Sequence, residues 1–273
     1  MPVLVLSSEN KELENEIAQK IAQNLEYTTL NREFFNEIAD KYSLDSKKLM
    51  DAMTITPSIL KRMPSKQWYY YLSCVETEVL DRLLEDNCVC WGLAAHLYVA
   101  VVSHVLKVRL IGGHDSISGS DKRNMTPDKI KKIIAEQERS RENWSMTAYN
   151  KKEAHPGLYD MVINLDQVQT DEVVKTLSTT MGYPRLKAMT YSINNLTDRA
   201  LAAKVKNVLL KSLTDIQVEA QNGTVVVTTT SMKREKSKKI DTIKSLAGQI
   251  DGIGYLEVHW HKDMITEAAM SYR

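Results

Sequence analysis

Long apolar runs, a leader-like pattern among the first residues and a CxxC cysteine pair are all missing from this 273-residue sequence. No stretch approaches the roughly 18 consecutive apolar residues that indicate a membrane-spanning helix. The N-terminus lacks a basic region followed by an apolar segment and a small-residue cleavage site, so we expect a cytoplasmic rather than an exported protein. The three cysteines, Cys74, Cys88 and Cys90, form no CxxC pair, which indicates buried thiols in a reducing compartment rather than disulfides or a metal site.

A strong net charge is also missing, because the formal net charge of +1 is too near zero to favour nucleic acid as a partner. The balance shifts along the chain, since 14 Lys and Arg residues but 9 Asp and Glu residues follow from Arg185 onward. The densest basic segment is KREKSKK, Lys233 to Lys239. Such a run is typical of a solvated helix start, and it also fits contact with an anionic surface or partner.

Glycine is absent from residues 7–15, although the surrounding sequence has the layout of a phosphate-binding turn. A short apolar run, PVLVLS, leads into an amphipathic helix from about Lys11, as a strand does when it enters a helix through a turn that binds phosphate. Three carboxylates occupy that turn instead: Glu9, Glu12 and Glu14. The sequence therefore has the strand–turn–helix order of a nucleotide-binding site, but its turn carries negative charge.

Residues 2–181 alternate short apolar runs with longer helical patterns. The expected strands are 2–7, 88–92, 105–111 and 159–165. The expected helices are 12–25, 31–41, 46–53, 66–85, a segment from about Ala94, 126–144 and 170–181. This alternation predicts an α/β domain with a parallel sheet that helices cover on both faces.

The pattern breaks at Gly182-Tyr183-Pro184, so we expect a first domain at 1–183, a linker at 184–196 and a second domain at 197–273. The second domain should contain, in order, a helix from Thr197 to about Lys211, a strand IQVEA, a turn at Asn222-Gly223, a strand TVVVTTT, a helix over 236–250 and a strand YLEVHWH. This order predicts a small α+β module of the αββαβ type.

The first part resembles the cytidylate-kinase-like branch of the nucleoside monophosphate kinases over most of residues 2–181. The matching pieces are Glu16-Ile17-Ala18, Leu30-Asn31-Arg32-Glu33, Val89-Cys90-Trp91-Gly92, Glu138-Arg139 and, most recognisably, Tyr159-Asp160-Met161-Val162-Ile163-Asn164. The resemblance implies a P-loop kinase-like sheet. It also suggests candidate nucleotide- or phosphate-binding residues, which are Lys11, Arg32, Arg139 and Arg141. The alternative is that the two arginines near residue 140 are ordinary surface residues.

The departures from this family fall in the phosphate loop. The family's Gly-Ser-Gly-Gly-Arg stands where this chain has residues 11–15, and glycines there let backbone N–H groups converge on phosphate. Leu13 and Glu14 have Cβ atoms where the family has glycines, and Asn15 stands where the family has the guanidinium group of an arginine. A carboxylate about 4 Å from a phosphate charge costs about 4 kcal/mol at an effective dielectric near 20. The alternative is that Glu12 and its neighbours point outward on a solvated helix face.

These departures favour a non-catalytic, kinase-derived regulatory or binding protein, with no catalytic residue and no cofactor assigned. The alternative is an active cytidylate or nucleoside monophosphate kinase that transfers phosphate from ATP to CMP with Mg²⁺, and in which Arg32, Arg139 and Arg141 contact phosphates. A third hypothesis is a scaffold that works by self-association and docking. The aromatic run from Trp68 to Tyr71 fits core packing, a base-stacking platform or an oligomer contact.

The C-terminal part resembles a BON domain, a module associated with docking to phospholipid surfaces or to proteins. The matching residues are Asp198, Asn222-Gly223, Val225-x-Val227, Ile250 and Gly252-Ile253, while Thr229 stands where the family usually has glycine. The resemblance implies a protein partner or an anionic surface. The expected docking residues are Lys233, Arg234, Lys236, Lys238 and Lys239.

Two pairs that contain histidine are weaker candidates. His114-Asp115 lies in a glycine-flanked loop, and we interpret it as a mobile surface pair rather than an acid–base dyad. His259-x-His261 places two imidazoles on one face of a strand, a spacing that can bind metal. No third ligand is evident, so the sequence predicts no metal site.

Overall fold

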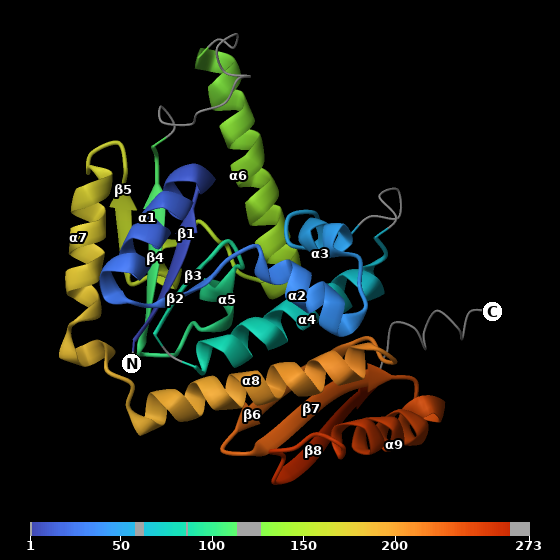
Figure 1. Ribbon diagram of the computed structural model, residues 1–273. Helices are drawn as coiled ribbons and strands as arrows, with labels where there is room; N and C mark the ends of the chain where they lie inside the picture. The colour runs from blue at the N-terminus through green and yellow to red at the C-terminus, as the bar shows by residue number, and fades with distance from the viewer. Residues whose placement is uncertain (1, 58–62, 86, 114–126, 263–273) are drawn as a thin grey trace.

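A computed structural model describes residues 2–57, 63–85, 87–113 and 127–262 of the chain (Figure 1). Its main sheet is parallel throughout, with the strand order β2-β3-β1-β4-β5. The strands are β1 (Val3–Ser8), β2 (Thr28–Leu30), β3 (Cys88–Trp91), β4 (Val105–Ile111) and β5 (Met161–Asn164). The predicted parallel sheet is confirmed, but β2 was not predicted, because its three residues include two exposed threonines and no apolar run.

Helices cover both faces of this sheet, as the sequence predicts. They are α1 (Lys11–Leu25), α2 (Phe34–Tyr42), α3 (Ser46–Ala52), α4 (Ser65–Leu83), α5 (Ala95–Tyr98), α6 (Pro127–Tyr149) and α7 (Thr170–Met181), with short 3₁₀ turns η3 (Pro156–Leu158) and η4 (Pro184–Leu186). Alternate residues of β1 enter two different cores, because successive strand side chains point to opposite faces. Val3 and Val5 pack with α2, α3 and α4, whereas Leu4 and Leu6 pack with α1 and α7.

The order of the strands fixes where a ligand site can form. The chain leaves β1 for the β2 side of the sheet and leaves β4 for the β5 side, and these two strands are neighbours. The carboxyl ends of β1 and β4 therefore flank a topological switch point, the place where α/β sheets bind ligands. Ser8 and Gly112 stand at these two ends.

The C-terminal part has its own three-stranded sheet in the order β6-β7-β8, with one antiparallel and one parallel pairing. Its elements are α8 (Thr190–Leu210), β6 (Ile216–Gln221), β7 (Thr224–Ser231), η5 (Lys233–Glu235), α9 (Lys236–Ala247) and β8 (Tyr255–Lys262). The predicted αββαβ order is confirmed, and Asn222 and Gly223 both have the positive φ of the predicted turn. The predicted start of its first helix at Thr197 is wrong, because α8 begins at Thr190.

The helix α8 lies between the two sheets and contributes to both cores (Figure 1). One side of α8 places Leu196, Ala200 and Ala203 in the core of the first sheet, against α4. The other side places Val205 and Leu209 in the core of the small sheet. A helix that is apolar on opposite sides is typical of a buried position between two packed layers.

Burial agrees with the interpretation of the cysteines. Cys74, Cys88 and Cys90 are free and buried. Burial raises the pKa of the Cys74 and Cys88 thiols to about 11, so both are protonated near neutral pH. None of the helices in the described ranges has the length and apolar character needed to cross a membrane.

Candidate functional site

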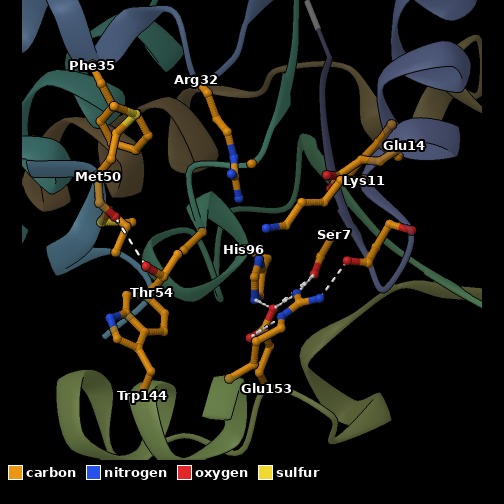
Figure 2. A pocket seen from close by; sticks show the side chains of 16 residues that line it. Ser7, Lys11, Glu14, Arg32, Phe35, Met50, Thr54, His96, Trp144 and Glu153 are labelled. Carbon is orange, nitrogen blue, oxygen red and sulfur yellow. Dashed lines mark hydrogen bonds and ion pairs between the residues drawn. The ribbon is translucent and has the colours of Figure 1, made fainter. Parts of the chain in front are cut away.

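A pocket with a cavity volume of about 100 Å³ opens at the carboxyl end of β1, beside the switch point (Figure 2). Its charged lining residues are Lys11, Glu14, Arg32, Arg141 and Glu153. Its apolar wall is formed by Phe35, Met50, Met53 and Trp144. Figure 2 shows Phe35, Met50 and Trp144 on the opposite side from Lys11. The cavity has room for several water molecules or one small anion.

The loop between β1 and α1 is closed by its own side chains. Asn10 is 2% exposed, and its Oδ1 accepts hydrogen bonds from Glu12 N at 3.0 Å and Leu13 N at 3.1 Å. The Asn10 Nδ2 donates to Gly113 O at 2.6 Å, which ties the loop to the end of β4. An Asn side chain thus caps two of the first amides of α1, and these are the groups that a helix N-terminus would offer to phosphate.

Two more loop side chains pack against the end of β4. Gly113 has a φ of +71°, and a Cβ atom there would lie 2.6 Å from Leu13 Cδ1, so the Leu13 side chain closely fills this space. The Glu9 carboxylate accepts hydrogen bonds from Arg109 Nη2 at 3.0 Å and from Gly112 N at 3.2 Å. Glu9 is therefore a structural tie between the loop and β4.

Glu12 and Glu14 have opposite orientations. Glu12 is exposed, whereas Glu14 is 5% exposed and lines the pocket. Burial raises the pKa of Glu14 to about 7, although Arg141 and Arg32 act in the opposite direction. The alternative hypothesis, that these carboxylates point outward on a solvated helix face, is therefore correct for Glu12 and wrong for Glu14.

Arg141 is held by the protein itself. Its guanidinium donates to Ser8 O at 2.5 Å and Ser7 Oγ at 3.2 Å, and it forms a two-nitrogen ion pair with Glu153 in which Nε lies 3.3 Å from Oε2. Although burial opposes the charged form, Arg141 and His96 hold the pKa of the Glu153 carboxyl below its ordinary value. These contacts join α6 to the end of β1. They also occupy the guanidinium nitrogen atoms of Arg141 that would bind phosphate if the chain were an active kinase.

The other three candidate cations differ in position. Arg139 is exposed on α6 and does not line the pocket. Lys11 and Arg32 line the pocket. Burial, with Arg32 and Arg141 as the nearby cations, lowers the pKa of Lys11. The structure thus brings Lys11, Arg32 and Arg141 together and leaves Arg139 outside.

His96 is a lining residue that the sequence analysis missed. Its side chain is 2% exposed, and within the described part of the chain neither ring nitrogen has a hydrogen-bond partner. Its Nε2 lies 3.6 Å from Glu153 Oε1, and its ring stacks on Tyr159 with the ring centroids 5.2 Å apart. Burial lowers the pKa of His96 to about 4, so the imidazole is neutral at pH 7. A buried polar ring without partners indicates a place where a ligand or water atom completes the site.

The expected docking residues lie in η5 and at the start of α9, and none of them lines this pocket. Two of them are used within the small domain: Lys236 lies over the Trp260 ring at 4.6 Å, and Lys239 Nζ donates to Thr230 O at 2.7 Å. The other three, Lys233, Arg234 and Lys238, are exposed.

The remaining candidates are the two histidine-containing pairs and the aromatic run. His259 Nε2 lies 2.7 Å from Glu257 Oε1, and within the described ranges no three His, Cys, Asp or Glu side chains gather in a metal-binding group. His114 and Asp115 lie outside the described residues. Core packing is confirmed for two members of the aromatic run, because Trp68 and Tyr71 are buried.

Comparisons relate this chain to a protein family and to solved structures. The model of the cytidylate kinase-like family matches residues 14–167, more than half of the chain. No curated protein matches. The similar solved structures include an uncharacterized protein from Eubacterium ventriosum ATCC 27560, with 11% identity, a TM-score of 0.48 and coverage of 66% of this chain and 98% of that one. They also include shikimate kinase from Bacteroides thetaiotaomicron, with 10% identity, a TM-score of 0.40 and coverage of 67% and 99%.

Proposed function

This chain belongs to the cytidylate kinase-like family, and from that premise we propose that its kinase-like domain is a non-catalytic regulatory or binding module. In this proposal the phosphate loop between β1 and α1 has lost its function, and ATP and Mg²⁺ are not used. The pocket holds the phosphate group of a small ligand, for which the family suggests a nucleoside monophosphate.

One observation carries the proposal: the Asn10 side chain occupies the amides of Glu12 and Leu13. A triphosphate bound in this loop would have to displace that cap, whose loss costs about 0.5–2 kcal/mol. It would also lie close to Glu14, whose carboxyl group faces the pocket. No cation within the described residues replaces the missing loop arginine, because Arg141 is committed to Glu153 and Lys11 faces the neighbouring pocket.

The pocket itself supports binding of a small anion. Lys11 and Arg32 converge on it, and the apolar wall that includes Phe35 and Met50 offers a surface for a base or another flat group. His96 offers one neutral donor and one acceptor. A charged end opposite an apolar wall matches a ligand with a phosphate head and an aromatic body.

We expect calorimetric titrations to show CMP binding, no ATP binding at micromolar concentrations, and no ADP formation when ATP, CMP and Mg²⁺ are mixed with the protein. The double variant Glu14→Gly/Asn15→Arg is expected to raise ATP affinity, because it removes a buried carboxylate and adds a cation to the loop. Glu16→Gly/Gln19→Arg is the matched control, since it makes the same changes at exposed positions of α1 beyond the loop.

ADP production by the unmodified protein would establish the alternative, an active nucleoside monophosphate kinase. Equal ATP affinity in the double variant and in its control would show that Glu14 and Asn15 do not block the loop. If neither CMP nor inorganic anions bound to the protein, the proposed binding function would be contradicted and the scaffold hypothesis would be favoured.

We further propose that the C-terminal domain is a BON-like docking module whose contact residues are Lys233, Arg234 and Lys238. These three side chains are exposed, and we leave out Lys236 and Lys239 because they make contacts within the domain. An anionic lipid surface fits this patch, because each basic residue near such a surface contributes about 1 kcal/mol.

Replacing Lys233, Arg234 and Lys238 by alanine is expected to weaken binding to phosphatidylglycerol vesicles about 100-fold, because three contributions of about 1 kcal/mol are lost. Co-sedimentation measures this change. The control replaces Lys47, Lys48 and Lys175, which are exposed elsewhere and remove the same charge. Similar losses in both variants would indicate a general charge effect and contradict a specific surface.

A further inference from the structure

We infer that Glu14 takes up a proton when an oxyanion binds between Lys11 and Arg32, so that ligand binding at this pocket is coupled to protonation of a buried carboxyl group. The inference rests on the proposed function, because it concerns the same pocket and gives it a form of regulation by pH. It names the chemical class of the bound group as a dianion of the phosphate or sulfate type.

The position of Glu14 is the first argument. Its side chain is 5% exposed and projects from the first turn of α1 into the pocket, where Figure 2 shows it beside Lys11. No hydrogen bond from a described residue reaches its carboxylate, unlike that of Glu9, which receives two. A buried carboxylate without hydrogen bonds is costly when ionised, so a proton is the simplest way to neutralise it.

The charged and titratable groups around Glu14 come from every element packed against it. They are Lys11 of α1, Arg32 of the β2–α2 connection, Arg141 of α6, Glu153 after α6, His96 of α5 and Cys90 of β3. Arg141 is neutralised by Glu153, and burial keeps His96 and Cys90 uncharged near neutral pH. Lys11 and Arg32 therefore remain as the cations that Glu14 and an incoming anion would share.

This sharing produces the coupling. In the empty pocket, burial holds the pKa of Glu14 at about 7, so ionised and protonated forms coexist at neutral pH. A dianion placed against Lys11 and Arg32 repels the ionised carboxylate and raises the Glu14 pKa further. The bound state is then one anion plus one proton on Glu14, and the proton comes from solvent. No covalent bond other than the O–H bond of Glu14 changes.

The test uses the full chain and sodium sulfate, which stays a dianion across the pH range at constant ionic strength. Sulfate affinity is expected to fall about tenfold between about pH 6 and 8, because the free Glu14 loses its proton across this range. Calorimetry at pH 7 in two buffers of different ionisation enthalpy should give an uptake of about half a proton per sulfate. Glu14→Gln should abolish both effects while sulfate binding persists. Glu16→Gln, at an exposed position of α1, should preserve them.

The outcomes separate this inference from the proposed function. Sulfate binding that is independent of pH in the unmodified protein would overturn proton coupling and leave the anion pocket intact. Binding that keeps its pH dependence in Glu14→Gln would assign the proton to Lys11 or His96 and overturn the role of Glu14. Absence of sulfate binding at every pH in both proteins would overturn the proposed anion pocket together with this inference.

Discussion

Glu153→Ala is expected to lower the free energy of unfolding by about 3–5 kcal/mol, because it leaves the Arg141 guanidinium without its counter-charge. The Glu153 side chain is 5% exposed and forms a two-nitrogen ion pair with Arg141. It also accepts a hydrogen bond from Ser7 Oγ at 3.1 Å and lies 3.6 Å from His96. Three elements, β1, α5 and α6, therefore meet at one carboxylate.

Urea denaturation measures this loss, and Glu142→Ala is the matched control. Glu142 belongs to the same helix as Arg141, and among the described residues its side chain forms only an exposed pair with Lys152 at 3.9 Å, so its loss should change the free energy of unfolding by less than about 0.5 kcal/mol. The double variant Arg141→Met/Glu153→Leu should be more stable than Glu153→Ala, because it removes both charges of the pair and leaves no unpaired guanidinium in this partly buried position. If Glu153→Ala were as stable as the unmodified protein, the ion pair between Glu153 and Arg141 would not have the stabilising role proposed for it.

The pKa of Glu153 adds a dependence on pH. Arg141 and His96 hold this pKa below its ordinary value, so Glu153 contributes stability above the ordinary carboxyl range. That contribution is lost as the pH falls through the lowered pKa of the folded protein. The difference in stability between the unmodified protein and Glu153→Ala should therefore be largest near neutral pH and smaller in acid.

The fold could largely be predicted because its determinants are local. Runs of four apolar residues predicted β1 and β3, shorter apolar runs predicted β4 and β5, and the turn at Asn222-Gly223 predicted the β6–β7 hairpin. The strand β2 has only Leu30 as a buried residue, so it gave no periodic signal. The start of α8 at Thr190 was missed because its first turns are polar and are held by packing through residues such as Leu196.

The site could be predicted only in part, because its chemistry depends on residues far apart in the chain. The departures at residues 11–15 pointed to the right loop, and Lys11 and Arg32 do line the pocket. Glu153 follows α6 without any motif, and His96 is a single polar residue in an apolar run. Neither carries a sequence signal for its position beside Arg141, which arises only when α5 and α6 pack against β1.

Leu196→Ala tests whether α8 makes the two domains one cooperative unit. Leu196 is 1% exposed and belongs to the core of the first sheet, so truncation should cost about 2–5 kcal/mol through lost burial and the cavity left behind. The same helix carries Leu209, which is buried in the core of the small sheet. Polar contacts strengthen the junction, since Asn207 Nδ2 donates to Ser73 Oγ at 2.9 Å and Lys204 pairs with Asp81 at 2.9 Å.

Because α8 is shared, loosening its contact with α4 should also loosen the small sheet. Hydrogen exchange followed by mass spectrometry is expected to show faster amide exchange in both β1 and β7 of Leu196→Ala, although Leu196 does not belong to the small core. Ile193→Ala is the control, because Ile193 lies on the same helix and is 42% exposed. Faster exchange in β1 with unchanged exchange in β7 would show that the small domain folds independently of the kinase-like domain. In that case α8 could not transmit occupancy of the pocket to the docking surface, and the two proposed activities would be separate.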